Sequence, residues 1–155
     1  MEGKMHWFGK RIARQDGFTL GEMLTTLGLF GILAAIAMPN FTSALPGLRL
    51  ADAARQIATD LQQIRMKAIA QSFPYQATFS ETTYLLQKCN GGCTADSGDI
   101  ALPIGITATA SAAPQFVSRG TASAGVTITL SNGTTTKYVC VKAVGRVNIQ
   151  DVVCS

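Results

Sequence analysis

Histidine, tryptophan and charge are scarce in this sequence. Its one histidine, His6, and one tryptophan, Trp7, lie near the N-terminus, and only 14% of its 155 residues are charged. Removal of residues 1–17 would leave no histidine, which excludes Ser-His-Asp and Cys-His catalysis and any histidine-ligated metal. Two acids, Asp96 and Asp99, lie in a loop rich in glycine and serine that is typical of a solvated turn. We therefore expect a protein that is not an enzyme and has neither metal nor cofactor; the alternative is an enzyme held by an N-terminal anchor.

A long apolar run stands near the N-terminus. Residues 18–38 carry a single charge, Glu22. About 20 apolar residues suffice for a helix to cross the roughly 30 Å hydrocarbon core of a bilayer. The segment before the run holds four bases and two acids. This excess of bases predicts a cytoplasmic N-terminus and an external position for residues after about 40.

The order of the segments around this run differs from that of an ordinary secretion signal. Such a signal places a small-residue cleavage site after a short apolar core. Here a polar, basic stretch ends in Gly17, and the full-length apolar run opens with the motif FTLGE at 18–22. This arrangement resembles the class III signal of type IV pilins and type II secretion pseudopilins. The resemblance implies that a prepilin peptidase cuts between Gly17 and Phe18 and methylates the new N-terminal residue.

Glu22 is the most informative residue of the run. A carboxylate in a membrane helix costs about 2.5 to 3.5 kcal/mol and persists mainly where it has a function. In a bundle of such helices, the freed amine of Phe18 on a neighbour would pair with Glu22, neutralise both charges and fix the axial register. The alternative is a structural role one turn from the helix N-terminus, where the helix dipole tolerates an acid and the side chain reaches the headgroups.

Helical periodicity returns between Leu48 and Gln71. Apolar residues fall at spacings of three and four, namely Leu50, Ala54, Ile57, Leu61, Ile64 and Ala68. Pro39 and Pro46 interrupt the pattern, and because proline removes an internal backbone hydrogen bond we expect the helix to kink or loosen there. The amphipathic stretch predicts the second half of one long helix, whose apolar stripe is covered by a head.

The residues after Pro74 have the composition of short strands separated by turns. We expect strands at 75–80, 83–88, 104–110, 115–118, 126–130, 137–144 and 147–153, with a hairpin around Asn132-Gly133. The predicted fold is α+β and pilin-like, with a long N-terminal helix packed on an antiparallel β-rich head. The expected divisions are a leader at 1–17, a transmembrane and assembly helix at 18–39, an amphipathic helix at 40–71 and an extracytoplasmic head at 72–155.

All four cysteines lie on the predicted outer side of the membrane, where disulfides form and persist. They are Cys89, Cys93, Cys140 and Cys154. Four cysteines allow three connectivities, and proximity favours the two local pairs. Closure of the 15-residue loop from Cys140 to Cys154 would stabilise a small head by about 3 kcal/mol. The alternative is a zinc site, but zinc ligands usually come as two closely spaced pairs and the second pair here is far apart.

Further motifs lie in the head. They are LQQIRMKAIA at 61–70, FVSRG at 116–120, and VCV at 139–141 leading to GRV at 145–147. With the N-terminus, they resemble the FimT/GspH family of minor pilins and pseudopilins. The resemblance implies a structural subunit that helps to initiate or cap a filament at the inner membrane, with prepilin peptidase and other major and minor pilins as partners. Our first interpretation is a FimT-like minor pilin of a type IV pilus, with a possible contribution to DNA uptake. The alternative is a GspH-like pseudopilin of a type II secretion system. The chain would be a single-pass inner-membrane protein with a periplasmic C-terminus before it enters a surface pilus or a periplasmic pseudopilus.

Bases outnumber acids at the C-terminal end, which hints at an anionic partner. From residue 119 onward the bases are Arg119, Lys137, Lys142 and Arg146, and the only acid is Asp151. Some FimT proteins bind DNA through a Gly-Arg-x-Arg motif whose guanidinium groups contact phosphates. This chain has GRVN at 145–148, so the second arginine is missing. One hypothesis is DNA binding by these four bases; the other, which the missing arginine favours, is a turn with a solvated arginine.

Overall fold

The computed structural model describes residues 17–154, so the predictions for residues 1–16 of the leader lie outside it. The chain divides into two units, Met1–Asn40 and Phe41–Ser155, and each is described by itself. The second is called the head unit below. The helix α1 extends over Leu20–Gln71 and therefore belongs to both units.

The helix begins at a side-chain cap. The Thr19 hydroxyl oxygen accepts a hydrogen bond from the backbone N–H of Glu22 at 3.2 Å, and the Thr19 carbonyl accepts one from the N–H of Met23 at 3.1 Å. Threonine at this position satisfies an N–H group that has no partner within the helix. The first helical residue is therefore Leu20, and Gly17 to Thr19 precede the helix.

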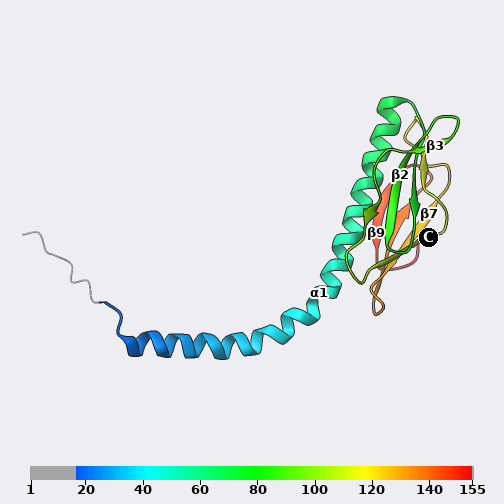
Figure 1. Ribbon diagram of the computed structural model, residues 1–155. Helices are drawn as coiled ribbons and strands as arrows, with labels where there is room; N and C mark the ends of the chain where they lie inside the picture. Colours follow the sequence, from blue (N-terminus) through cyan, green and yellow to red (C-terminus); the bar gives the residue numbers. More distant parts are fainter. Residues whose placement is uncertain (1–16, 155) are drawn as a thin grey trace, which may run out of the picture. The chain divides into compact units, whose positions relative to one another are not determined.

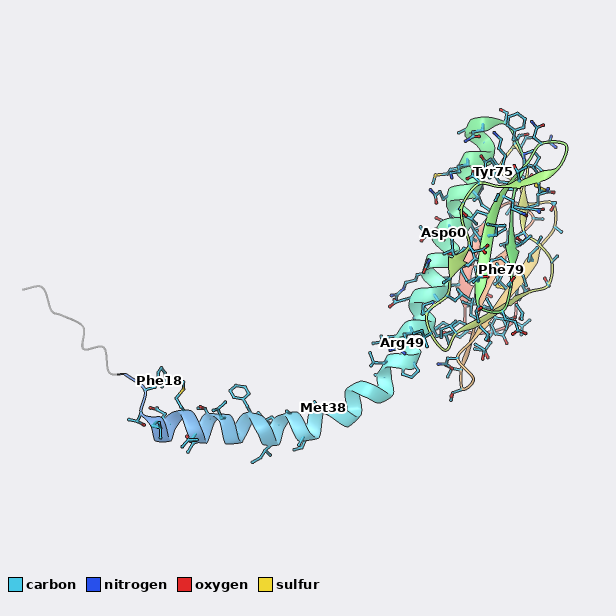
Figure 2. The ribbon with its side chains drawn as sticks, in the orientation of Figure 1. Phe18, Met38, Arg49, Asp60, Tyr75 and Phe79 are labelled. Atoms are coloured by element: carbon cyan, nitrogen blue, oxygen red, sulfur yellow. A yellow bond between two sulfur atoms is a disulfide. The ribbon has the colours of Figure 1, made fainter. Side chains whose placement is uncertain are left out.

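The first unit offers an apolar helix that is long enough to cross a membrane. The stretch Leu20–Met38 meets the length and composition of a membrane span, and none of it is buried. Figure 2 shows its side chains projecting from the helix between the labelled Phe18 and Met38. The hydroxyls of Thr25 and Thr26 each donate to the carbonyl of Glu22 at 2.9 Å, so these polar groups are satisfied within the helix. This satisfaction lowers the cost of placing them in hydrocarbon.

The head unit packs one end of α1 against two antiparallel sheets (Figure 1). The first sheet has the order β3-β2-β1-β6, with β4 also paired to β2; its strands are β1 Tyr75–Phe79, β2 Thr83–Cys89, β3 Cys93–Ala95, β4 Ile100–Ala101 and β6 Gln115–Phe116. The second has the order β5-β7-β8-β9; its strands are β5 Thr107–Ala110, β7 Val126–Ser131, β8 Thr136–Val141 and β9 Val147–Gln150. The predicted α+β, pilin-like fold is confirmed.

Each strand expected from the sequence has a counterpart, with shifts at the ends. Three shifts reach three residues: β5 begins at Thr107, β9 ends at Gln150 and β8 ends at Val141. The strand β8 ends there because Lys142–Arg146 form a turn, in which the N–H of Lys142 donates to the carbonyl of Arg146 at 2.8 Å. Two short strands, β3 and β4, were not predicted. They have three and two residues, too few for period-two alternation to be seen.

The predicted β7–β8 hairpin is present with Leu130 opposite Lys137. The turn is held by Asn132, whose side-chain oxygen accepts hydrogen bonds from the N–H groups of Thr134 and Thr135 at 3.0 and 2.7 Å. Gly133 has φ +84°, which glycine adopts without steric cost. The side chain of Asn132 and the freedom of Gly133 together explain why this pair marks the turn.

The core lies between the inner face of α1 and both sheets. Each residue of the predicted helical stripe is buried, and Ile57 and Ile64 are fully buried. The sheets contribute large side chains to this core, among them Tyr75, Tyr84, Phe116, Ile128, Leu130 and Val139. Residues Val126, Ile128 and Leu130 of β7 are buried while those between them are half-buried, which is the alternation of a strand with one face on the core.

Two disulfides fix the head, and they join local pairs. Cys89 is bonded to Cys93 with a Cα–Cα distance of 4.0 Å, and Cys140 is bonded to Cys154 with a Cα–Cα distance of 5.7 Å. Cys140 is fully buried in the middle of the second sheet, so its bond ties the C-terminal segment to that sheet. All four cysteines are engaged in these bonds and supply no thiolate to a zinc ion.

The hydrogen bond between Tyr84 and Asp60 leads to a prediction about the stability of the fold at alkaline pH. The phenol of Tyr84 donates a hydrogen bond to the Asp60 carboxylate of α1, which Figure 2 labels on the stretch of the helix that lies along the sheets. Burial raises the pKa of Tyr84 above its ordinary value of 10.0, and the bond to Asp60 raises the pKa further. Because the phenol loses its proton more readily in the unfolded chain, its contribution is complete below about pH 10 and falls as the pH rises beyond that value.

We expect Tyr84→Phe to lower the free energy of unfolding by about 1 to 2 kcal/mol at neutral pH, because a hydrogen bond to a charged group is lost. The difference between parent and variant should be constant up to about pH 10 and shrink between about pH 10 and pH 11. Urea unfolding of both chains across this range measures the difference. A gap that stays constant to pH 11 would contradict the assignment.

Candidate functional site

The expected processing and assembly residues lie together at the start of the first unit. Gly17 and Phe18 precede the helix and are exposed, with the Phe18 side chain 80% exposed. Glu22 occupies the first turn of α1 and is also exposed. Its carboxylate forms no hydrogen bond or ion pair among residues 17–38 and 44–154. The carboxylate is therefore available to a group on another chain.

A second arrangement stands out in the head unit, where two turns have the same hydrogen-bond pattern. In the turn Val117–Thr121, the N–H of Gly120 donates to the carbonyl of Val117 at 2.8 Å, and the N–H of Val117 donates to the carbonyl of Thr121 at 2.9 Å. In the turn Lys142–Arg146, Gly145 and Lys142 make the corresponding bonds, both at 2.8 Å. Each turn needs a glycine at its fourth position, where φ is +79° and +83°.

The two turns are packed against each other and against α1. A Cβ atom added to Gly145 would overlap the carbonyl oxygen of Gly120 and would lie 2.9 Å from Nε of Arg65. Arg65 donates a hydrogen bond from Nε to that same carbonyl at 2.7 Å. The N–H of Ala122 also donates to the carbonyl of Ala143 at 2.9 Å. Both glycines are therefore required for their φ angles, and Gly145 is also required for the close approach of the two backbones.

The packed turns bring together three of the four bases that the sequence singled out. Arg119 precedes Gly120, whereas Lys142 and Arg146 flank the second turn, and both arginines are exposed. Lys137 lies near the other end of β8, about 16 Å along the strand from Lys142. Its ammonium group forms an ion pair with Asp151. Lys137 is therefore separate from the other three bases.

Arg146 has a local partner at the position where the DNA-binding motif would have its second arginine. Arg146 directly precedes β9 and Asn148 lies within it, and the Asn148 amide, oriented so that both its polar atoms are satisfied, accepts a hydrogen bond from Nη2 of Arg146 at 3.0 Å. One edge of the guanidinium is thus engaged within the chain. Arg65 is the base that the sequence analysis missed. The sequence shows a glycine in each of the two turns, but it does not show that both turns contact the helix at Arg65.

Comparison with known proteins agrees with this architecture. The model of the family described as type II transport protein GspH matches residues 53–145, which is more than half of the chain. The chain belongs to the GspH family. The match covers α1 from Ala53 onward, the strands β1 to β8, and the glycines of both turns, Gly120 and Gly145. No curated protein sequence matches the chain.

Solved structures of a minor pseudopilin and of a type IV minor pilin share the fold. The minor pseudopilin EpsH from the type 2 secretion system of Vibrio cholerae has 10% sequence identity and a TM-score of 0.57, over 66% of this chain and 96% of that chain. The type IV minor pilin FimU of Pseudomonas aeruginosa has 16% identity and a TM-score of 0.55, over 68% of this chain and 97% of that chain. At such identities the likeness shows the fold alone.

Proposed function

We propose that this GspH-family chain is a structural subunit that helps to initiate or cap a pilin-type filament at the inner membrane and is not an enzyme. The observation that carries the proposal is an exposed, membrane-length apolar helix with one charge, Glu22, at its start, joined to a GspH-type head. Such a helix supplies the contact with other pilins, and the head stands on the periplasmic side. The excess of bases before the helix supports this orientation.

Maturation by prepilin peptidase is part of this proposal. Gly17 and Phe18 stand before the helix and are exposed, which supports access of a peptidase to the bond between them. We expect the chain produced together with a prepilin peptidase to begin at a methylated Phe18, as measured by intact mass. Gly17→Leu should leave the full-length mass, because a bulky side chain at the cut blocks access. A native chain that still begins at Met1 would contradict the proposal.

Two filament systems are candidates, and different comparisons favour each of them. The minor pilin FimU shares the fold, which favours our first choice, a type IV pilus. The family description and the fold of EpsH favour a type II secretion pseudopilus. Deletion of the gene in its own host separates them: loss of surface pili with normal protein secretion supports the pilus, and the reverse supports the pseudopilus.

DNA uptake does not belong to the proposal. Of the four bases in that hypothesis, Lys137 is paired with Asp151 and Arg146 is partly engaged by Asn148. A duplex held through few phosphate contacts binds weakly at physiological salt. DNA binding stays a prediction from the sequence, and its test is included in the next experiment.

A further inference from the structure

The two packed glycine turns and the adjacent face of α1 form one surface, which we call the basic–apolar corner. It consists of Arg65, Met66, Ile69, Arg119, Lys142, Val144 and Arg146. A Cβ atom at Gly120 would lie 2.6 Å from Cδ1 of Ile69, which shows that the helix face and the turns are in direct contact.

The charge of the corner is uncompensated. Its four bases form no ion pair or hydrogen bond with an acid among residues 17–154. Of the other five bases in the head unit, three pair with an acid: Arg55 with Asp52 at 3.3 Å, Lys67 with Asp96 at 2.7 Å, and Lys137 with Asp151. Four of the six head-unit bases without an acidic partner among the described residues therefore gather at the corner, where their charge is open to a partner.

The corner also exposes aliphatic side chains among these bases. Met66, Ile69 and Val144 are 63%, 49% and 69% exposed. Beside Met66 and Ile69, a hollow of about 290 Å³ is lined by these two residues together with Gln62 and Arg65. Methionine, arginine and aliphatic groups without acids are typical of the centre of a protein–protein interface.

Resting on the proposed function, we propose that the basic–apolar corner docks the head of another pilin-type subunit of the same filament, through a surface on that subunit with aliphatic groups at its centre and acids around them. The acids complement the four bases, and the aliphatic groups remove Met66, Ile69 and Val144 from water.

A nucleic acid fits the corner less well than a protein does. Phosphates gain nothing from contact with aliphatic side chains, and no aromatic residue of the described head is among its exposed large apolar side chains, so none offers a stacking platform for a base. Salt dependence is common to both kinds of partner, whereas burial of Val144 is expected only for a protein.

The test uses photo-crosslinking of the full chain in the membranes of its own host. The photo-reactive residue benzoylphenylalanine replaces Val144 in one strain, Phe30 of the apolar helix in a second, and Ile104 in a third. Ile104 is the matched control, because it is 89% exposed but lies in the loop between β4 and β5. The Phe30 arm tests the proposed function independently of the corner.

We expect adducts with pilin-type subunits at positions 30 and 144 and none at 104. In the Val144 strain, the double variant Arg119→Glu/Arg146→Glu should lower the adduct yield about tenfold, and Arg119→Lys/Arg146→Lys should keep most of it. Replacement of a matching acid on the captured subunit by a base should restore the adduct yield of the glutamate variant. Both arginines are exposed, so equal melting temperatures are expected for all variants.

Four results would overturn the inference. An adduct at Phe30 without one at Val144 removes the docking site and leaves the proposed function intact. An adduct at Val144 with only a second copy of this chain assigns the corner to self-association. If Val144 gives no protein adduct, and the full chain in detergent retains duplex DNA while the glutamate variant does not, the corner is assigned to DNA. The absence of adducts at Phe30 removes the proposed function and the inference with it.

Discussion

Gly145→Ala should lower the free energy of unfolding of the head by about 3 to 4 kcal/mol. At φ +83° a Cβ atom costs about 1 to 2 kcal/mol by itself. At this position the atom would also overlap the backbone carbonyl of Gly120, which cannot rotate away as a side chain could. One of the two turns must shift, and the hydrogen bond from Arg65 to Gly120 is then lost or lengthened.

Gly133→Ala is the matched control for this substitution. Gly133 has φ +84°, but a Cβ atom there would have no neighbour within 4 Å. The control therefore carries the cost of the backbone angle without the overlap, and we expect a loss of about 1 kcal/mol. Urea unfolding of the three full-length chains in detergent gives the comparison. Equal losses in the two variants would show that the turns do not need to be in contact.

Glu22→Ala should lower incorporation of the chain into filaments at least about tenfold. The carboxylate has no ion-pair partner within the described residues, and under the proposed function its compensating charge would come from another chain. Its removal leaves the amine of a neighbouring Phe18 unpaired in a medium of low dielectric constant, which is the costly case for a buried ion pair. Cleavage and membrane insertion should be normal, because an alanine makes the helix more apolar.

The readout is the ratio of chain in sheared filaments to chain in the membrane, measured by immunoblot. Thr25→Ala is a suitable control, because Thr25 is a polar neighbour whose hydroxyl is satisfied by the Glu22 carbonyl within the same helix. We expect that variant to assemble normally. If the two variants assembled equally well, Glu22 would have only a local role at the helix terminus.

The sequence predicted the elements whose signals are local. Spacings of three and four from Leu50 to Ala68 identified the face of α1 that is buried, and alternation from Val126 to Leu130 with Asn132-Gly133 identified the β7–β8 hairpin. These patterns are readable because the period of a helix or strand decides which side chains share a face. The short strands β3 and β4 have no such pattern, and pairing with β2 alone brings them into the sheet.

The candidate sites also differ in whether local sequence was enough to predict them. The processing and assembly hypothesis rests on the order of Gly17, Phe18 and Glu22, which lie within six positions of each other. The hypothesis for the bases needed distances that the sequence does not contain. It grouped Lys137 with Arg146, although the structure pairs Lys137 with Asp151, and it missed Arg65, which lies on the helix.

By itself, the sequence determined an apolar N-terminal helix with one acid, an amphipathic continuation of that helix and a strand-rich head with four cysteines. Only the tertiary structure decided that the turns around Gly120 and Gly145, 25 positions apart, pack on each other and on Arg65. The physical reason is that the period of a helix or strand decides which of its side chains share a face, and this period can be read from the sequence. The close approach of two backbones depends instead on how both sheets pack on the helix.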